Sequence, residues 1–292
     1  MKLWTPLSAA LLALAAWVAT AQSDSLRFPK SVAAGSSFTV STSGSGSATL
    51  FIAGLDGVVE RKVQLGEEIS LGPEDVHNAG HYVAVLVGGS SSQSAQFDVI
   101  AQPEAAKVSF LAKPSRVQVN LASGVSGVTY LFDAFRNLII KPQTVSFELS
   151  DSTGGKQSRT ATSKDGVAWV RLNSAPKAGA ATFQAVAGPV EEKRIIQQVP
   201  GDPCTLRMSA HASSAPQRIA LETDPVHDCN GNPIPDGTVV SFTETYAGTQ
   251  TTVDVPLKRG VAKTELPANK GAVISVAAGV VLGNEIHWNG GL

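Results

Sequence analysis

The sequence predicts an all-β protein made of three tandem β-sandwich domains that follow an N-terminal signal peptide. Apolar residues recur at every second position through almost all of the chain, which is the period of a strand with one buried face. One segment is also duplicated without a gap, because residues 133–147 and 228–242 align at a constant offset of 95 positions. Tandem copies at a fixed spacing indicate an array of similar units, each of which contacts mainly its neighbours.

Residues 1–21 have the composition of a secretory signal peptide. A lysine near the start is followed by an apolar run over residues 7–18, and Ala19 and Ala21 supply the small residues of a cleavage site. The run is shorter than the roughly 20 residues that a membrane span requires, and a retained N-terminal anchor is the alternative interpretation. We expect a mature chain that begins at Gln22, has no transmembrane segment, and is secreted into the medium, the periplasm or the cell envelope.

The composition suits packed domains and excludes some partners. Removal of 21 residues from 292 leaves 271, or about 90 for each of three domains, which is a typical size for a small sandwich. A net charge of −1 predicts no general attraction to nucleic acid or to anionic membranes. An aromatic content of only 6% argues against a broad stacking surface for bases or sugars, whereas 43% hydrophobic residues are ample for cores.

The three predicted domains span residues 22–101, 104–199 and 203–292. Glycine, proline and Asp-Gly pairs mark the turns between their strands, and Pro200 and Pro203 mark the second linker. The alternating apolar positions are Phe38, Val40, Tyr82, Ala84, Leu86, Phe97 and Val99 in the first domain, Val117, Val119, Val145, Phe147 and Leu149 in the second, and Leu206, Met208, Ile219, Leu221, Val240 and Phe242 in the third.

The third domain carries the motif D-x-x-G-N-P-x-P-D-G-T-x-V-x-F, which begins at Asp228 and includes Gly231 and Asn232. This motif resembles part of the bacterial immunoglobulin-like domains of group 1, the rod modules of invasin- and intimin-type adhesins. The second domain follows it more loosely from Asp133 to Asn137, with arginine and leucine where the motif has glycine and proline. The resemblance implies immunoglobulin-like sandwiches, and it does not extend to the anchoring or receptor-binding parts of such adhesins.

The recurrence of Asp228 as Asp133 predicts a structural role for the two aspartates, because an aspartate in a loop can accept hydrogen bonds from backbone N–H groups. Asp224, His227 and Asp236 lie close to Asp228 in the sequence. Oxygen-rich loops of this kind can hold calcium, so a calcium site is the alternative that we weigh against the structural role. We predict no metal or other cofactor.

The first domain contains a segment ending at Tyr82 that resembles the D-x-G-x-Y corner of immunoglobulin folds, with asparagine in place of aspartate. In such a corner the tyrosine hydroxyl contacts nearby backbone. His77 and His81, four residues apart beside Glu74 and Asp75, would suggest a metal site if the segment were helical. The corner instead predicts a turn with solvated histidines.

Cys204 and Cys229 are the only cysteines. Cys204 opens the first strand of the third domain and Cys229 follows the second strand, so antiparallel pairing brings them to the same end of the sandwich. In an oxidising compartment we predict a disulfide, which would close a loop of 26 residues and contribute about 3.5 kcal/mol in the chain-entropy model. A free thiol or a metal ligand is the alternative.

Catalysis is not indicated. No serine lies in a nucleophile elbow, and neither a paired-carboxylate motif nor a phosphate-binding or dinucleotide-binding loop is present in the sequence. Trp169 and Trp288 are the only tryptophans after residue 21. The alternation around Trp169 predicts a core or half-buried position, whereas Trp288 lies on the last strand, where edge exposure and a ligand contact are the alternative.

These observations favour a non-enzymatic structural or adhesive protein, built as a short rod that spaces or presents a binding surface for an unknown protein or cell-surface ligand. The alternative is a soluble binding module that recognises a protein or carbohydrate through loops at one end of a sandwich. An accessory domain of a secreted enzyme is a third class, for which the chain offers no catalytic part. No residue identifies the ligand.

Overall fold

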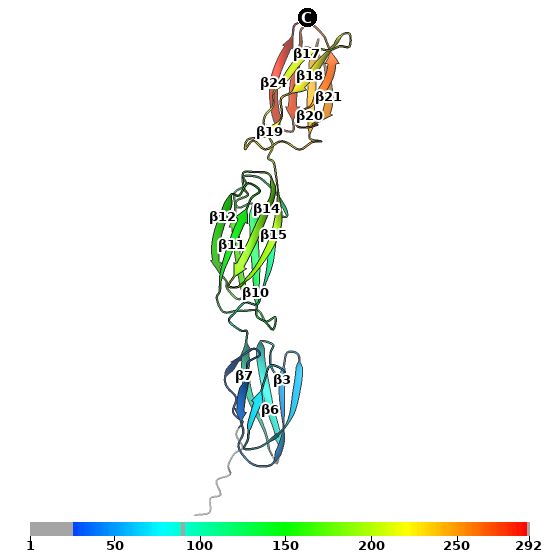
Figure 1. Cartoon of the computed structure of the whole chain (residues 1–292). Coiled ribbons are helices and arrows are strands. Elements are labelled where there is room, and N and C mark those ends of the chain that lie inside the picture. The colour runs from blue at the N-terminus through cyan, green and yellow to red at the C-terminus, as the bar shows by residue number, and fades with distance from the viewer. Residues whose placement is uncertain (1–25, 89–90, 291–292) are drawn as a thin grey trace, which may run out of the picture. The chain divides into compact units, whose positions relative to one another are not determined.

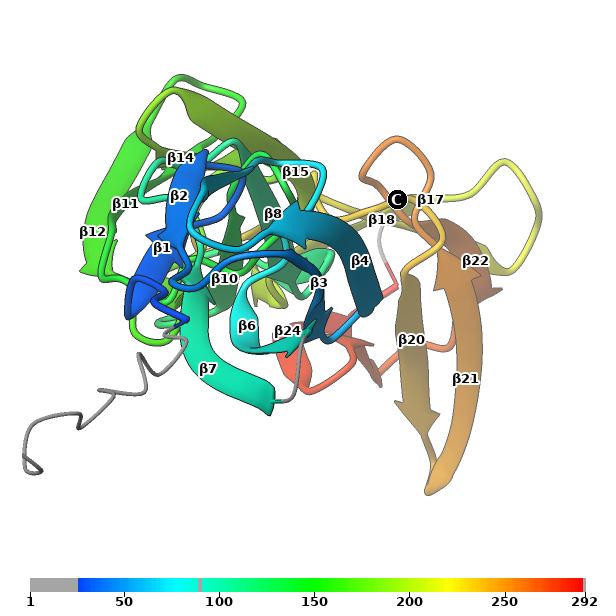
Figure 2. The ribbon, with the colours of Figure 1, turned by 90° about the horizontal axis from the view of Figure 1, so that it is seen from below.

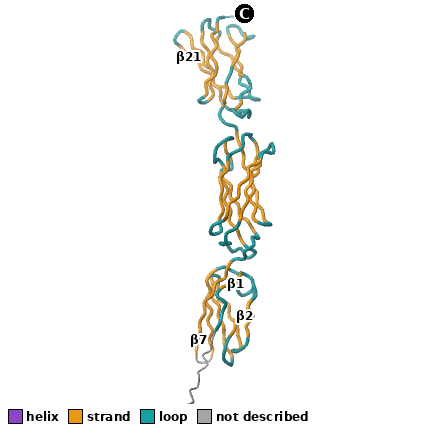
Figure 3. Tube along the Cα trace, turned by 90° about the vertical axis from the view of Figure 1, so that its left-hand side faces the viewer, coloured by secondary structure: helices purple, strands orange, loops and turns teal. Residues whose placement is uncertain are grey.

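The computed structural model describes residues 26–88 and 91–290 of the chain (Figure 1). All regular structure in these residues is β-strand, as the colours of Figure 3 show, and the predicted all-β fold class is confirmed. None of the described residues form a helix that is long and apolar enough to cross a membrane. The expected signal peptide, residues 1–21, lies outside the described residues.

The first sandwich packs a five-stranded sheet, in the order β1-β7-β6-β3-β4, against the two-stranded sheet β2-β5. Strand β1 runs parallel to β7, and the other pairs are antiparallel. In the core, the ring of Phe97 stacks on Phe28 and Tyr82, with centroids 4.8 and 5.4 Å apart. The strands are β1 Ser31–Ala33, β2 Phe38–Ser41, β3 Ser47–Gly54, β4 Gly57–Gln64, β5 Glu68–Leu71, β6 Gly80–Gly88 and β7 Ser91–Ile100.

The second sandwich packs the sheet β13-β10-β8 against the sheet β12-β11-β14-β15-β9. Strand β9 runs parallel to β15, as β1 does to β7. The core contains three phenylalanines, and the ring centroid of Phe110 lies 5.0 Å from that of Phe183 and 6.0 Å from that of Phe147. The strands are β8 Lys107–Lys113, β9 Arg116–Gln118, β10 Val125–Phe132, β11 Thr144–Ser150, β12 Lys156–Thr162, β13 Val167–Leu172, β14 Gly179–Ala187 and β15 Val190–Val199.

The third sandwich packs the sheet β21-β20-β23-β24 against the sheet β17-β18-β22, with the short pair β16-β19 at one end. The β20–β21 hairpin is visible in Figure 2. Phe242 is fully buried in the core, and Trp288 packs partly buried against it. The strands are β16 Pro203–Thr205, β17 Met208–Ala212, β18 Arg218–Thr223, β19 His227–Asp228, β20 Val239–Tyr246, β21 Thr249–Pro256, β22 Lys263–Pro267, β23 Ala272–Ala278 and β24 Val281–Trp288.

The contacts divide the chain into two compact units. Unit 1 contains the first sandwich together with Phe132–Ile139, and unit 2 contains Ala105–Leu131 with Ile140–Leu292. Phe132 is the last residue of β10, and residues 133–139 belong to the loop between β10 and β11 of the second sandwich. This loop therefore makes its contacts with the preceding sandwich, and it includes one of the two duplicated motifs.

The expectation that Trp169 lies in the core or is half-buried is wrong, because Trp169 is 63% exposed. Strand β13 alternates between two faces, and the buried face consists of Ala168, Val170 and Leu172. Trp169 shares the opposite face with the exposed Arg171. Both faces carry apolar residues, so alternation alone did not determine which of them is buried.

Candidate functional site

The duplicated motifs form two loops that are each organised by the aspartate. The carboxylate oxygen Oδ1 of Asp133 accepts hydrogen bonds from the backbone N–H groups of Phe135 and Asn137, at 2.9 and 2.8 Å. Oδ1 of Asp228 accepts the equivalent bonds from Asn230 and Asn232, also at 2.9 and 2.8 Å. Both aspartates are almost fully buried. The carboxylate thus satisfies donors that a turn would otherwise leave unpaired.

The asparagine of each loop binds the aspartate and then reaches the preceding sandwich. Nδ2 of Asn137 donates to Asp133 Oδ2 at 3.0 Å and to the carbonyl of His77 at 2.8 Å. Oδ1 of Asn137 accepts from the backbone N–H of Ala79 at 2.7 Å. Asp133 Oδ2 also accepts from the backbone N–H of Gln102 at 3.0 Å. We call this set the Asp–Asn clamp.

The third sandwich repeats the Asp–Asn clamp atom for atom within unit 2. Nδ2 of Asn232 donates to Asp228 Oδ2 and to the carbonyl of Pro176, both at 2.9 Å. Oδ1 of Asn232 accepts from the backbone N–H of Ala178 at 2.9 Å. Asp228 Oδ2 accepts from the backbone N–H of Gly201 at 3.0 Å. In both clamps the receiving groups belong to backbone, so they do not depend on side-chain identity.

Hydrogen bonds also determine the ionisation of Asp228. Burial alone raises the pKa of the Asp228 carboxyl, but the bonds from Asn232, Gly201 and Asn230 outweigh burial and hold the pKa below its ordinary value. The carboxylate is therefore charged at neutral pH, and it accepts charge-assisted hydrogen bonds, which are stronger than neutral ones.

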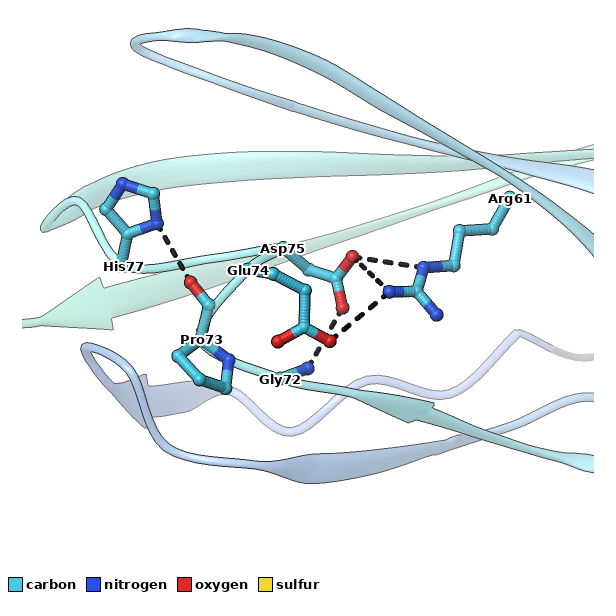
Figure 4. Close-up of polar contacts among 6 residues, drawn as sticks. All are labelled: Arg61, Gly72, Pro73, Glu74, Asp75 and His77. Carbon is cyan, nitrogen blue, oxygen red and sulfur yellow. Dashed lines mark hydrogen bonds and ion pairs between the residues drawn. The ribbon is translucent and has the colours of Figure 1, made fainter.

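In the first sandwich, an ion pair between the partly exposed Arg61 and the buried Asp75 shapes the turn that receives the clamp (Figure 4). Arg61, on β4, donates to Asp75 Oδ1 through Nε at 3.0 Å and through Nη2 at 2.6 Å. Asp75 Oδ2 accepts from the backbone N–H of Gly72 at 2.9 Å, and the His77 ring lies 2.9 Å from the carbonyl of Pro73. These bonds fix the turn just before the carbonyl of His77 that Asn137 uses.

The residues considered as a metal site, Glu74, Asp75, His77 and His81, each contact a partner outside this set. Asp75 binds Arg61, Glu74 lies 3.5 Å from the same guanidinium, and His81 lies 3.0 Å from Asp98. In the third sandwich, Asp236 accepts from the backbone N–H of Gly260 at 3.1 Å. Among the described residues, no three His, Cys, Asp or Glu side chains are grouped so as to hold a metal ion.

The two clamps make different contacts through the residue two positions after the aspartate, which we call the plug. In the first clamp the plug is Phe135, which packs against the core of the first sandwich and over Gly35. A Cβ atom built on Gly35 would lie 1.9 Å from the Phe135 ring, so only glycine leaves room for the ring. Gly35 also has a φ of +68°, in the left-handed region.

In the second clamp the plug is Asn230, and its contacts are polar. Asn120 donates from Nδ2 to Asn230 Oδ1 at 3.1 Å, and Lys177 Nζ donates to the carbonyl of Asn230 at 2.9 Å. Asn120 stands where the first sandwich has Gly35, because each follows the strand that runs parallel to the last strand of its sandwich. The φ of Asn120 is +61°, so Asn120 and Gly35 both lie in the left-handed region although only Asn120 has a side chain.

A disulfide joins Cys204 to Cys229, as the sequence predicts, with the two Cα atoms 4.7 Å apart. Cys229 immediately follows Asp228, and β16 pairs with β19, so the disulfide anchors the second clamp loop to the start of its own sandwich. A disulfide between the only two cysteines indicates an extracytoplasmic location, because cytosolic thiols are kept reduced.

Tyr82 and Gly231, the other two residues that the sequence singles out, lie beside the first clamp and within the second. The Tyr82 hydroxyl donates to the carbonyl of Asn78 at 2.9 Å, four residues earlier. This bond lies beside the backbone that receives Asn137. Gly231, inside the second clamp loop, has a φ of +74°. Its counterpart in the first loop is Arg136, which adopts the same conformation with a φ of +68°.

Two solved structures share this fold over about nine tenths of the chain. Invasin, a bacterial integrin-binding protein, aligns with a TM-score of 0.50 and 13% identity over 89% of this chain, which spans 57% of the invasin chain. InvD of Yersinia pseudotuberculosis aligns with a TM-score of 0.51 and 12% identity, over 90% of this chain and 96% of the InvD chain. The predicted resemblance to the immunoglobulin-like domains of invasin-type adhesins is thus confirmed at the level of the fold. No family model matches the sequence, and no curated protein matches it significantly.

Proposed function

We propose that this chain is a non-enzymatic structural or adhesive protein, secreted or associated with the cell envelope, whose tandem sandwiches space or present a binding surface. The domains of this proposal are residues 22–101, 104–199 and 203–292, preceded by a signal peptide over residues 1–21. The partner that we propose is a protein or another cell-surface ligand, since invasin, which shares the fold, is an integrin-binding protein.

The repeated Asp–Asn clamp is the observation that carries the proposal. Flexible linkers without such contacts leave neighbouring domains free to reorient. Here each clamp ties a loop of one sandwich to backbone groups of the sandwich before it, through Asn137 in one case and Asn232 in the other. Contacts that restrict the reorientation of neighbouring domains help a protein to present a surface, whereas catalysis does not require them.

A soluble module that binds its ligand through sandwich-end loops is the competing function. The loops that carry Asp133 and Asp228 are at sandwich ends, but their polar groups are already bonded to the preceding sandwich. These two loops are therefore poor candidates for a ligand site, and the proposal places the presented surface elsewhere.

The test is fractionation of the native organism followed by mass spectrometry of the N-terminus. The proposal expects the chain in the envelope or the medium, with an N-terminus at Gln22 or within a few residues of it. Recovery in the cytoplasm with Met1 intact would overturn the proposal. Recovery only as a freely diffusing periplasmic protein would favour the competing function.

A further inference from the structure

The outer face of the sheet β13-β10-β8, in the second sandwich, exposes apolar and aromatic side chains together. Trp169 is 63% exposed, Leu111 51% and Tyr130 36%. Trp169 on β13 lies directly opposite Val128 on β10, and both point away from the core. We call this surface, together with the exposed Arg171 and Lys113, the Trp169 face.

Exposed aromatic rings are concentrated on this face. Among the phenylalanine, tyrosine and tryptophan side chains of the described residues, three are at least 36% exposed, and two of them, Trp169 and Tyr130, belong to β13 and β10. The third, Tyr246, lies on β20 of the third sandwich. Because large apolar side chains are costly to leave in water, a cluster of them that includes two aromatic rings marks a binding surface.

The charged residues on the three strands of the Trp169 face are all basic, and one carboxylate, that of Glu192 on β15, lies at the edge of β8, where it accepts a hydrogen bond from the backbone N–H of Phe110 at 2.6 Å. Strands β8, β10 and β13 contain Lys107, Lys113 and Arg171 and no aspartate or glutamate, although acidic residues outnumber basic ones in the whole chain by 24 to 23. The ion pairs of the described residues involve other cations. Ser126 donates to the carbonyl of Lys113 at 3.1 Å and lies opposite Arg171, so two of the cations flank one strand. Charge complementarity therefore calls for an anionic partner.

The Trp169 face is too small for a stable interface with a folded anionic protein. Three strands about 4.8 Å apart and roughly six residues long offer about 300 Å², whereas a stable interface between folded proteins buries about 800 Å² on each side. A narrow, extended polymer fits this area better than a protein surface does. The extracytoplasmic location indicated by the disulfide favours a polysaccharide over a nucleic acid.

We propose that the Trp169 face binds an acidic polysaccharide, a chain of sugar rings that carry carboxylate or sulfate groups. The apolar faces of the sugar rings pack on Trp169 and Tyr130, which provide flat apolar area at little cost in conformational freedom. Arg171 forms paired hydrogen bonds with a carboxylate or sulfate, and Lys113 adds a second charge. The inference names a ligand class for the surface that the proposed function presents.

The test is calorimetric titration of the mature chain with polygalacturonate, heparin, neutral dextran and a single-stranded oligonucleotide. We expect polygalacturonate, heparin or both to bind with an affinity that falls as salt rises, and dextran not to bind. Trp169→Ala should weaken binding about tenfold or more, and Arg171→Gln should weaken it and flatten its salt dependence. Both side chains are exposed, so neither change should alter the thermal unfolding of the protein.

Tyr246→Ala is the matched control, since it removes an exposed aromatic ring from another sandwich and should leave binding unchanged. The proposal is overturned if neither acidic polysaccharide binds, if Trp169→Ala binds like the wild type, if dextran binds equally well, or if the oligonucleotide binds more tightly. Binding by the purified chain and location in the cell are separate measurements, so this inference and the proposed function can fail independently.

Discussion

Replacing the plug pair of the first clamp by that of the second clamp tests whether a plug is stable only with its own partner residue. The first clamp pairs Phe135 with Gly35, and the second pairs Asn230 with Asn120. Gly35→Asn places a side chain where the Phe135 ring lies, because even a Cβ there would be 1.9 Å from it. The backbone itself tolerates the change, since Asn120 holds the same left-handed conformation.

The magnitude follows from the burial of Phe135. A fully buried phenylalanine contributes about 1.5–3 kcal/mol, and Phe135 is half-buried, so expelling it costs about 1.5 kcal/mol. Phe135→Asn loses the same packing and leaves a polar group without its partner. Each single change should therefore cost about 1.5 kcal/mol. The double change Gly35→Asn with Phe135→Asn recreates the polar pair and should cost less than either single change.

Hydrogen exchange at the Ala79 amide, which donates to Asn137, reports on the stability of the first Asp–Asn clamp. Because about 1.4 kcal/mol is a factor of ten, each single variant should exchange about tenfold faster than the wild type, and the double variant within about threefold of it. The Ala178 amide, in the second clamp, is the internal control and should not change. If the free-energy changes of the two single variants simply add in the double variant, its Ala79 amide will exchange faster than in either single variant. That result would refute the idea that each plug requires its own partner residue.

Three further predictions concern the third sandwich. Asp228→Ala removes the acceptor of four hydrogen bonds. This change should lower the free energy of unfolding of the third sandwich by about 3 kcal/mol, measured in denaturant by Trp288 fluorescence. The control Asp202→Ala, which changes an exposed residue in the same linker, should alter this free energy by no more than about 0.5 kcal/mol. Because the pKa of Asp228 is lower in the folded state, the contribution of Asp228 is fully present above its ordinary pKa of 3.8 and is lost as pH falls further. The gap in stability between the wild type and Asp228→Ala should therefore narrow as pH falls below about 4, and a gap that stays constant would contradict this. Reduction of Cys204–Cys229 should lower the unfolding temperature of the third sandwich alone in calorimetry, by the equivalent of about 3.5 kcal/mol, and an equal shift in all three transitions would count against independent cores.

The sequence predicts most of the fold because alternation and turns are local. It also predicts that Asp133 and Asp228 cap their loops, since an aspartate repeated at a fixed offset in a turn has few other roles. It does not predict what Asn137 and Asn232 bind. Their partners are backbone groups in another sandwich, and a backbone N–H or carbonyl leaves no trace in side-chain identity.

The plug and the Trp169 face were missed for other reasons. Phe135 and Asn230 differ in chemistry, so an alignment treats them as a mismatch, although each matches its own partner at Gly35 or Asn120. For Trp169, a signal existed: the residue two positions later is arginine, which seldom faces a core. Size and apolarity favoured burial, but the charged neighbour on the same face was the better guide.

The direction of the clamps has a consequence for how the chain matures. In both cases the groups that reach out lie later in the sequence than the groups that receive them: Asn137 binds at residues 77 and 79, and Asn232 binds at residues 176 and 178. Chains are synthesised from the N-terminus, and domains generally fold as units in that order. Each newly emerging sandwich thus meets a finished surface on its predecessor, and the array can assemble step by step in the order of its synthesis.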